Sequence, residues 1–280
     1  MKITAALLAD RRRIREAAQA RRRPPRVPPA AVPRAAIAAY AQVARRVLAA
    51  LDDVALRALS DAGVRVDADG GGADPLPRPL RGRLVRWMTS LLRRVTAPAV
   101  LSRELDDVAA QTNTLSREQW QMQARAALGI DLQADPDVRP QLTAFRDQGV
   151  ALIRSLGREK IARVRDILDA GAGDRVEDIA ARIREETQAT PARAQLLARD
   201  QVLKLNNSVT QARHQAAGVT EYIWRTSRDE RVRSRHKELE GTQQAYASPP
   251  IVDRRTGRRA HPGGDYQCRC TAEPIIPRFE

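Results

Sequence analysis

Cysteine, aromatic residues and long apolar runs are all scarce in this chain of 280 residues. The two cysteines, Cys268 and Cys270, are one residue apart, which is too close for an unstrained disulfide, so no disulfide framework is expected. No apolar run approaches the length of a transmembrane helix, and the apolar stretch near the N-terminus is too short for a signal peptide. We therefore expect no contact with membranes and a chain made and kept in a reducing cytoplasm.

The shortage of aromatic residues restricts the fold class. Three Trp, four Tyr and two Phe leave the core to Ala, Leu, Val and Ile, which favours helices over a strand-rich barrel or sandwich. Only the segment 219–226, VTEYIWRT, has the aromatic and β-branched composition typical of a strand. The predicted fold is mostly α, with a small C-terminal α+β module.

Lysine is also rare, and arginine dominates the charge. Four of the 49 basic residues are lysine, so 45 are arginine, and the chain carries a formal net charge of +15 at pH 7. The planar guanidinium group suits phosphates and carboxylates, so a polyanion is the partner that the composition favours.

Two segments carry nearly all of this excess charge. Residues 1–34 hold ten basic and two acidic groups, and residues 81–103 hold six basic groups and no acidic one. Several prolines follow the first arginines, which predicts a stiff arm over residues 1–34 that lies along DNA or an acidic partner, or else remains a solvated tail. The arginines proposed to make this contact are Arg11, Arg12, Arg13, Arg21, Arg22 and Arg23.

Helical periodicity organises most of the remaining chain. The apolar spacing over 34–59 and in RGRLVRWMTSLLRRV predicts amphipathic helices, and a capping-box pattern at Ser116 and Gln119 predicts a short helix that ends at Gly129. Further helices are expected over the ranges 140–169, 174–187, 191–218 and 228–240. The predicted segments are the arm 1–34, a helical region 35–128 for portal or capsid contact, a helical region 129–218, and the α+β module 219–280.

The distinctive chemistry lies after residue 220. On a helix over 228–240, Asp229, Arg233, His236 and Glu240 would form one polar stripe, which is typical of a salt-bridged surface. Four residues could supply two imidazoles and two thiolates to a tetrahedral zinc ion: His236, His261, Cys268 and Cys270.

A zinc site is not the interpretation that the spacing favours. The usual zinc knuckle has two residues between its cysteines, and this chain has one, so we expect Cys268 and Cys270 to be small buried groups and no cofactor to be required. Pro262, Gly263 and Gly264 would form a tight turn. Arg269 would point to the opposite side and pair with an acid. A Cys-His nucleophile pair remains an alternative, without a local sequence typical of a known family.

Two strings in this region resemble the C-terminal domain of phage minor head proteins of the Mu F type, also called head morphogenesis proteins. They are YIWRTSRDERVRSRHKELEG and SPPIVDRRTGRRAHPGGDYQCRCTAEPII. The resemblance covers about residues 129–278. The residues that carry it are Trp224, Asp229, Arg231, Val232, Arg233, His236, Leu239, Gly241, Pro262, Gly263, Asp265, Cys268, Arg269 and Cys270.

This resemblance implies a virion protein and not an enzyme. Such proteins are minor components of the capsid interior, associated with the portal vertex, and assist head assembly, DNA packaging or DNA delivery. The expected partners are therefore portal protein, capsid protein and packaged double-stranded DNA, bound without base recognition. The alternative is a metal-dependent nuclease or transferase that uses the C-terminal His/Cys residues.

Overall fold

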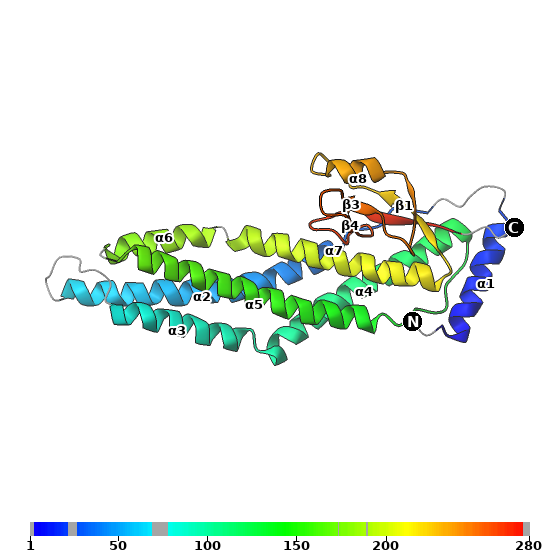
Figure 1. Cartoon of the computed structure of the whole chain (residues 1–280). Helices are drawn as coiled ribbons and strands as arrows, with labels where there is room; N and C mark the ends of the chain where they lie inside the picture. The colour runs from blue at the N-terminus through cyan, green and yellow to red at the C-terminus, as the bar shows by residue number, and fades with distance from the viewer. Residues whose placement is uncertain (1–2, 22–26, 69–77, 173, 189, 277–280) are drawn as a thin grey trace. The chain divides into compact units, whose positions relative to one another are not determined.

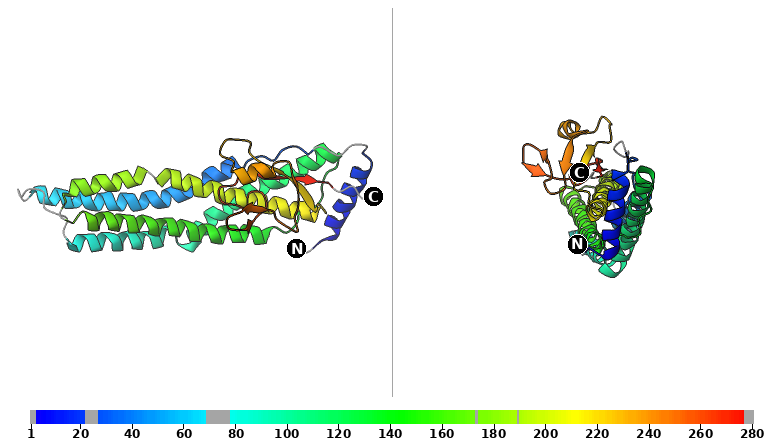
Figure 2. Two further views of the ribbon diagram at one scale, coloured as in Figure 1. Left: turned by 45° about the horizontal axis from the view of Figure 1, so that its top comes forward. Right: turned by 90° about the vertical axis from the view of Figure 1, so that its right-hand side faces the viewer.

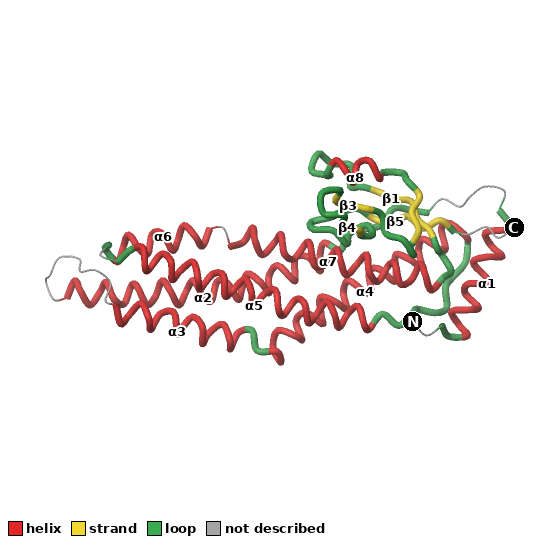
Figure 3. The backbone as a smooth tube through the Cα atoms, in the orientation of Figure 1, coloured by secondary structure: helices red, strands yellow, loops and turns green. Residues whose placement is uncertain are grey.

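The computed structural model describes residues 3–21, 27–68, 78–172, 174–188 and 190–276. Long helices make up most of these residues, and the strands lie in the C-terminal part (Figure 1, Figure 3), which confirms the predicted fold class. The helices are α1 (Ala5–Gln19), α2 (Arg34–Ala68), α3 (Arg78–Val95), α4 (Pro98–Leu128), α5 (Arg139–Ala170), α6 (Val176–Gln188), α7 (Thr190–Ala216) and α8 (Ser234–Leu239). The strands are β1 (Glu221–Arg225), β2 (Gln243–Ala245), β3 (Ile251–Asp253), β4 (Arg258–Arg259) and β5 (Thr271–Ile275). Within the described ranges, no helix has both the length and the apolar character needed to cross a membrane.

The chain forms two compact units, each built from separate stretches of sequence. Unit 1 contains residues 1–36, 108–145 and 199–280, and unit 2 contains residues 37–107 and 146–198. The helices α2, α4, α5 and α7 each contribute residues to both units. The units therefore do not coincide with the consecutive segments that the sequence predicts.

Unit 2 is a bundle in which parts of α2, α3, α5 and α6 lie side by side (Figures 1 and 2). Gly157 of α5 allows close packing, because a Cβ atom there would overlap the side chain of Leu92 of α3. A buried ion pair joins α5 to α2, with Lys160 Nζ 2.7 Å from Asp52 Oδ1. The bundle is thus held by close helix contact and by a charge pair removed from water.

The predicted amphipathic helix after residue 80 is α3. Leu84, Met88 and Leu92 are buried along one side, at the spacing of one helix face. Trp87 lies off this face and remains half exposed, with the guanidinium of Arg83 over its ring. The apolar side of α3 packs within unit 2, while its tryptophan and most of its arginines face solvent.

Unit 1 carries the sheet and its core. The three-stranded sheet has the antiparallel order β2-β1-β5, and β3 pairs with β4 in a separate antiparallel ribbon. Tyr222 and Trp224 of β1 are two residues apart, so both point to the same side, where they are fully buried. They share one apolar cluster with Trp120 of α4 and Ile14 of α1.

The basic arm predicted over residues 1–34 is not an arm in its first part, because residues 5–19 form the helix α1, which packs within unit 1. Thr4 caps this helix by accepting a hydrogen bond from Leu7 N at 3.3 Å, and the prolines begin only beyond its end. Ile14 and Ala18, one turn apart, are buried in the unit 1 core. The apolar spacing within this arginine-rich stretch was the local signal for a helix.

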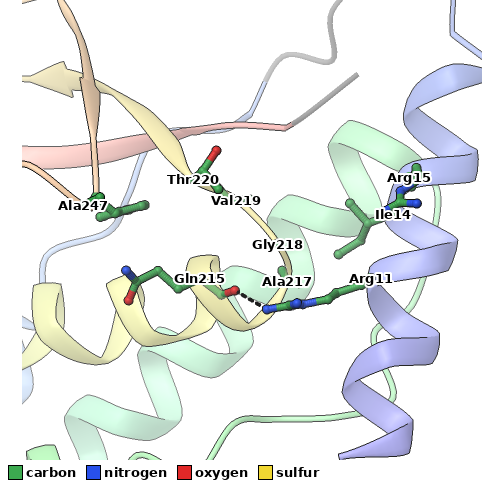
Figure 4. A pocket seen from close by; sticks show the side chains of 10 residues that line it. Arg11, Ile14, Arg15, Gln215, Ala217, Gly218, Val219, Thr220 and Ala247 are labelled. Atoms are coloured by element: carbon green, nitrogen blue, oxygen red, sulfur yellow. Dashed lines mark hydrogen bonds between the residues drawn. The ribbon is translucent and has the colours of Figure 1, made fainter. Parts of the chain in front are cut away.

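Two of the proposed DNA-contacting arginines are engaged within unit 1. Arg11 donates from Nε to Ala216 O at 2.6 Å and from Nη2 to Gln215 O at 2.8 Å, so it caps the end of α7 (Figure 4). Arg13 pairs with Asp10. The exposed Arg12 pairs with Glu16 one turn along α1.

The proline-containing stretch that follows is also attached to unit 1. Gln123 of α4 donates to Pro28 O at 2.7 Å, and Val27 packs against the apolar cluster. Arg22 and Arg23 lie outside the described residues. The segment 27–33 therefore packs on unit 1 and is not a solvated tail.

The helix predicted to begin at Ser116 is the second half of α4, which begins at Pro98 and runs unbroken through the capping-box pattern. The Ser116 side chain serves a tertiary contact instead, 3.0 Å from Thr210 Oγ1 of α7. The predicted end of the helix is confirmed, because Gly129 adopts a φ of +73° directly after Leu128.

Candidate functional site

A histidine and two cysteines meet at the centre of the C-terminal module. His236 lies on α8, and Cys268 and Cys270 lie in the segment that leads into β5. His236 Nδ1 is 3.5 Å from the Sγ atom of each cysteine, and the three ligand atoms all lie within 4.8 Å of one another. All three side chains are buried.

The helix that carries His236 is shorter than predicted. Residues 227–233 form turns, with Arg228 at a φ of +55°, and α8 begins only at Ser234. The expected polar stripe is therefore wrong, because only His236 of its four members lies within α8. This turn segment allows Asp229 to reach Arg269, with Arg269 Nη1 2.5 Å from Asp229 Oδ2.

Asp265 lies on the other side of the His236 ring. Its Oδ2 atom is 3.2 Å from His236 Nε2 and accepts a hydrogen bond from Arg233 Nη1 at 2.6 Å. Its Oδ1 atom is 2.9 Å from Arg258 Nη2 and accepts from Tyr266 N at 2.8 Å. Asp265 is buried, so these two guanidinium groups compensate a carboxylate that is removed from water.

The surroundings shift the pKa values of the three clustered groups. The hydrogen bond with Cys270, supported by His236 and opposed by burial, lowers the pKa of the Cys268 thiol to about 5, and the same interaction together with burial raises the pKa of Cys270. Burial acts to lower the pKa of His236, but the hydrogen bond with Cys268 and the nearby charge of Asp265 outweigh it and raise this pKa. The site thus favours a thiolate at Cys268 beside an imidazole.

The segment before the cysteines forms the expected tight turn. Gly263 has a φ of +77°, and a Cβ atom there would overlap the side chain of Asn207 on α7. Gly263 N donates to Cys268 Sγ at 3.3 Å, so the turn contacts the cluster directly. Arg269 points away from both cysteines and pairs with Asp229, as predicted from the alternation of an extended segment.

His261 does not join the other predicted zinc ligands. Its Nδ1 atom is 2.9 Å from the hydroxyl of Tyr222, and its ring packs edge-on against Tyr246. Tyr246 in turn lies 2.7 Å from His214 Nδ1 through its hydroxyl. The predicted four-residue set is therefore wrong in one member, and the described residues bring three of the four together.

The remaining motif residues shape the module. Trp224 packs edge-on against the His236 ring, with ring centres 5.4 Å apart. Gly241 has a φ of +75° and donates from its backbone to Trp224 O, which returns the chain to the sheet after α8. Arg231 is exposed, and its backbone N–H donates to Asp229 Oδ1.

Sequence reasoning missed a buried histidine beside this module. His214 of α7 packs against Trp120 and is buried next to Arg213, and burial followed by that neighbouring charge lowers the pKa of His214 to about 3. A lone histidine within a long helix carries no spacing signal, so only the fold reveals these contacts. At neutral pH the ring is uncharged.

A small cavity of about 120 Å³ lies beside the cluster. Its lining includes His236, both cysteines and several arginines, namely Arg199, Arg231, Arg233 and Arg269. The arrangement can hold a metal ion or a thiolate, and its surroundings are positively charged.

Comparison with known proteins confirms the predicted resemblance for the C-terminal region. Residues 164–273 match the model of the family described as Phage Mu protein F like protein. An uncharacterized protein of Haemophilus influenzae is 36% identical over 158 residues, which cover 54% of this chain and 34% of that protein. The chain thus spans about a third of the length of this relative. No solved structure matches the chain.

Proposed function

We propose that this chain is a minor head protein of a phage, a structural component that takes part in head assembly and not an enzyme. The observation that carries this proposal is the match of residues 164–273 to the phage Mu protein F like family, which supports a phage head-related protein found in the virion. The pairing of the charged motif residues within the module agrees with a structural role, as in the contacts of Asp229 with Arg269 and of Asp265 with Arg233.

The proposed location is the capsid interior at the portal vertex, with portal protein or capsid protein as the partner. Support comes from the Mu F type of the C-terminal region and from apolar side chains left at the surface of unit 2. Trp87 of α3 and Val100 of α4 are each half exposed, which is the kind of residue that protein contacts bury.

Co-assembly tests this proposal. The full chain would be co-expressed with the portal protein and the major capsid protein of the same phage, and procapsids would be separated by sedimentation. We expect the chain in the procapsid fraction, and Trp87→Ala to lower its amount relative to Leu196→Ala, which changes another exposed apolar residue of unit 2. A chain that stays at the top of the gradient, or a purified chain that cleaves DNA with a loss of cleavage in His236→Ala, would refute the structural role.

Contact with packaged DNA is the second part of the proposal, and α3 is the segment that we assign to it. Its exposed arginines are spread along a helix without acidic residues, and they would neutralise phosphates without reading bases. These arginines are Arg83, Arg86, Arg93 and Arg94. The assignment moves the expected DNA contact away from residues 1–34, where Arg11 and Arg13 serve unit 1.

Filter binding at two salt concentrations tests this assignment. Replacing the four α3 arginines with glutamine should weaken binding for all DNA sequences and lower the salt slope by about 3 to 4, roughly one for each lost phosphate contact. The matched control replaces four other exposed arginines, Arg117, Arg184, Arg254 and Arg255. An unchanged slope in the α3 variant, or an equal loss in the control, would contradict the assignment.

A further inference from the structure

We propose that His236, Cys268 and Cys270 bind one zinc ion, through Nδ1 and two Sγ atoms, and that water completes the coordination from the adjoining cavity. The ion would tie α8 to the segment before β5, and with three protein ligands and water the site would differ from the closed four-residue set of most structural zinc sites. The proposal does not depend on the role of the protein in a phage head.

The distances between the three ligand atoms agree with a shared metal ion. Bonds of about 2.3 Å from zinc to sulfur and about 2.0 Å from zinc to nitrogen place the sulfur and the nitrogen about 3.5 Å apart in a tetrahedron. Both sulfurs lie 3.5 Å from the same Nδ1 atom. A nucleophilic cysteine paired with a base would require only one such distance.

Hydrogen bonding alone accounts less well for two sulfur atoms at the same distance from one ring nitrogen. A ring nitrogen offers either one N–H or one lone pair, so His236 Nδ1 can form one strong hydrogen bond and not two. Without a metal, Nδ1 would therefore bond to only one of the two sulfurs, although both lie at the same distance from it. A zinc ion bound by two thiolates and a neutral imidazole gives a set without net charge, which is better suited to a buried place.

Asp265 lies on the side of the His236 ring where metal-binding histidines usually have a carboxylate partner, although the contact does not meet hydrogen-bond geometry. It lies 3.2 Å from Nε2, the ring nitrogen that faces away from the cysteines. A carboxylate in this place favours the proton on Nε2 and leaves the lone pair of Nδ1 directed at the metal. Arg233 and Arg258 hold Asp265 in position.

The short spacing of the cysteines is compatible with this site. In an extended segment, residues two apart point to the same side, and here the intervening Arg269 points to the other side and pairs with Asp229. The two sulfurs are therefore brought together by an extended segment with one residue between the cysteines. The common zinc knuckle instead uses a turn with two residues between them.

The fourth coordination position is assigned to the small cavity beside the cluster. Its volume of about 120 Å³ is enough for water, and Ser227 and Gln267 contribute polar groups to its lining. The surrounding arginines disfavour a second cation. We therefore expect one metal ion per chain and not a dinuclear centre.

Metal analysis of the full chain tests the proposal. The chain would be purified with its affinity tag removed and without chelators, and zinc would be measured by inductively coupled plasma mass spectrometry and by native mass spectrometry. We expect one zinc ion per wild-type chain, and at least a tenfold lower content in Cys268→Ser and in Cys270→Ser. His261→Gln is the matched control, because this histidine lies outside the cluster, and it should keep the full zinc content.

A second measurement applies if the cysteine variants do not fold. Treating the wild-type chain with a strong chelator should remove the zinc and lower Tm, and added zinc should restore Tm. Cobalt in place of zinc should give the absorption of thiolate-to-cobalt charge transfer. Folded wild-type chain that holds no stoichiometric zinc after incubation with zinc, or zinc that remains in the Cys268→Ser/Cys270→Ser variant, would overturn the proposal.

Discussion

Replacing the buried Arg213 with methionine should destabilise unit 1 more than any change of a surface arginine. The guanidinium of Arg213 lies on α7 and donates to both oxygens of Asp135, at 2.7 and 2.8 Å. It also donates to Ser116 at 2.9 Å and to Asn113 at 2.7 Å, both on α4. One side chain therefore joins α7, α4 and the segment between α4 and α5.

The expected loss follows from what remains after the guanidinium is removed. Breaking a buried ion pair on one side costs about 3–5 kcal/mol, because its partner stays behind without compensation. Asp135 retains 29% exposure of its side chain and can take up water, and Ser116 keeps its contact with Thr210. We therefore expect Arg213→Met to lower the free energy of unfolding by about 3 kcal/mol, near the lower end of that range.

Urea unfolding followed by tryptophan fluorescence measures this loss. In a Trp87→Phe background, the remaining tryptophans, Trp120 and Trp224, are buried in unit 1 and report on its unfolding. Arg12→Met is the control: it removes an arginine that is paired at the surface, with 81% of its side chain exposed, and should cause no measurable loss.

The partner variant Asp135→Asn completes a double-mutant cycle with Arg213→Met. Because Asp135→Asn leaves the fully buried guanidinium of Arg213 without its counter-charge, we expect a loss at least as large as for Arg213→Met. The two changes together should cost less than their sum. A loss below about 1 kcal/mol for Arg213→Met at an unchanged m-value would refute the idea that this network holds the helices together.

Two further changes test the packing of unit 1. The buried His214 has a pKa of about 3, well below its usual 6.5, so below pH 6.5 the unfolded chain binds a proton that the folded chain does not. The free energy of unfolding should therefore decrease as pH falls below about 6.5. For this group the decrease is up to about 1.4 kcal/mol per pH unit. Urea unfolding at several pH values should show a shallower dependence in His214→Gln, and equal slopes in both chains would contradict this account. Gly263→Ala should lower Tm more than Gly257→Ala, because both glycines have positive φ but only a Cβ atom at Gly263 would overlap Asn207. Equal shifts in Tm would mean that the overlap with Asn207 is relieved without cost.

The long helices and the first strand could be predicted because their signals are local. The apolar spacing of residues 34–59 and 140–169 corresponds to α2 and α5, and the alternation around Tyr222 and Trp224 corresponds to β1. Gly129 and Gly241 mark the expected ends of helical segments, because both need a positive φ. Each of these elements is specified by residues within a few positions of one another.

The errors concern residues whose partners are distant in the sequence. Arg11 was assigned to a free arm, yet it caps a helix 205 residues away. Asp229 was placed on a helix, but its pairing with Arg269 belongs to a turn. His261 matches the composition of a zinc ligand and instead bonds to Tyr222. Net charge and local spacing contain no information about such long-range contacts.

The candidate site was partly predictable for the same reason. The motif identified His236, Cys268 and Cys270 together, but only the fold places both sulfurs at the same distance from one ring nitrogen. The contact of Asp265 with His236 joins a turn to α8 and has no local sequence signal.

The docking of α1 on the end of α7 sets an order of events during synthesis. The partners of Arg11 are the carbonyl groups of Gln215 and Ala216, which leave the ribosome about 10–40 s after α1 at ordinary rates of translation. During this interval Ile14 and Ala18 lack the part of their apolar cluster that residues 217–276 supply, so we expect α1 to dock fully only after α7 and the sheet have been made. Expressing residues 164–273 alone would uncover part of the apolar cluster around Tyr222 and Trp224, since Ile14 and Trp120 lie outside that range. We therefore expect residues 164–273 expressed alone to be less stable than the same residues within the full chain, because part of their apolar cluster is supplied by residues that precede residue 164.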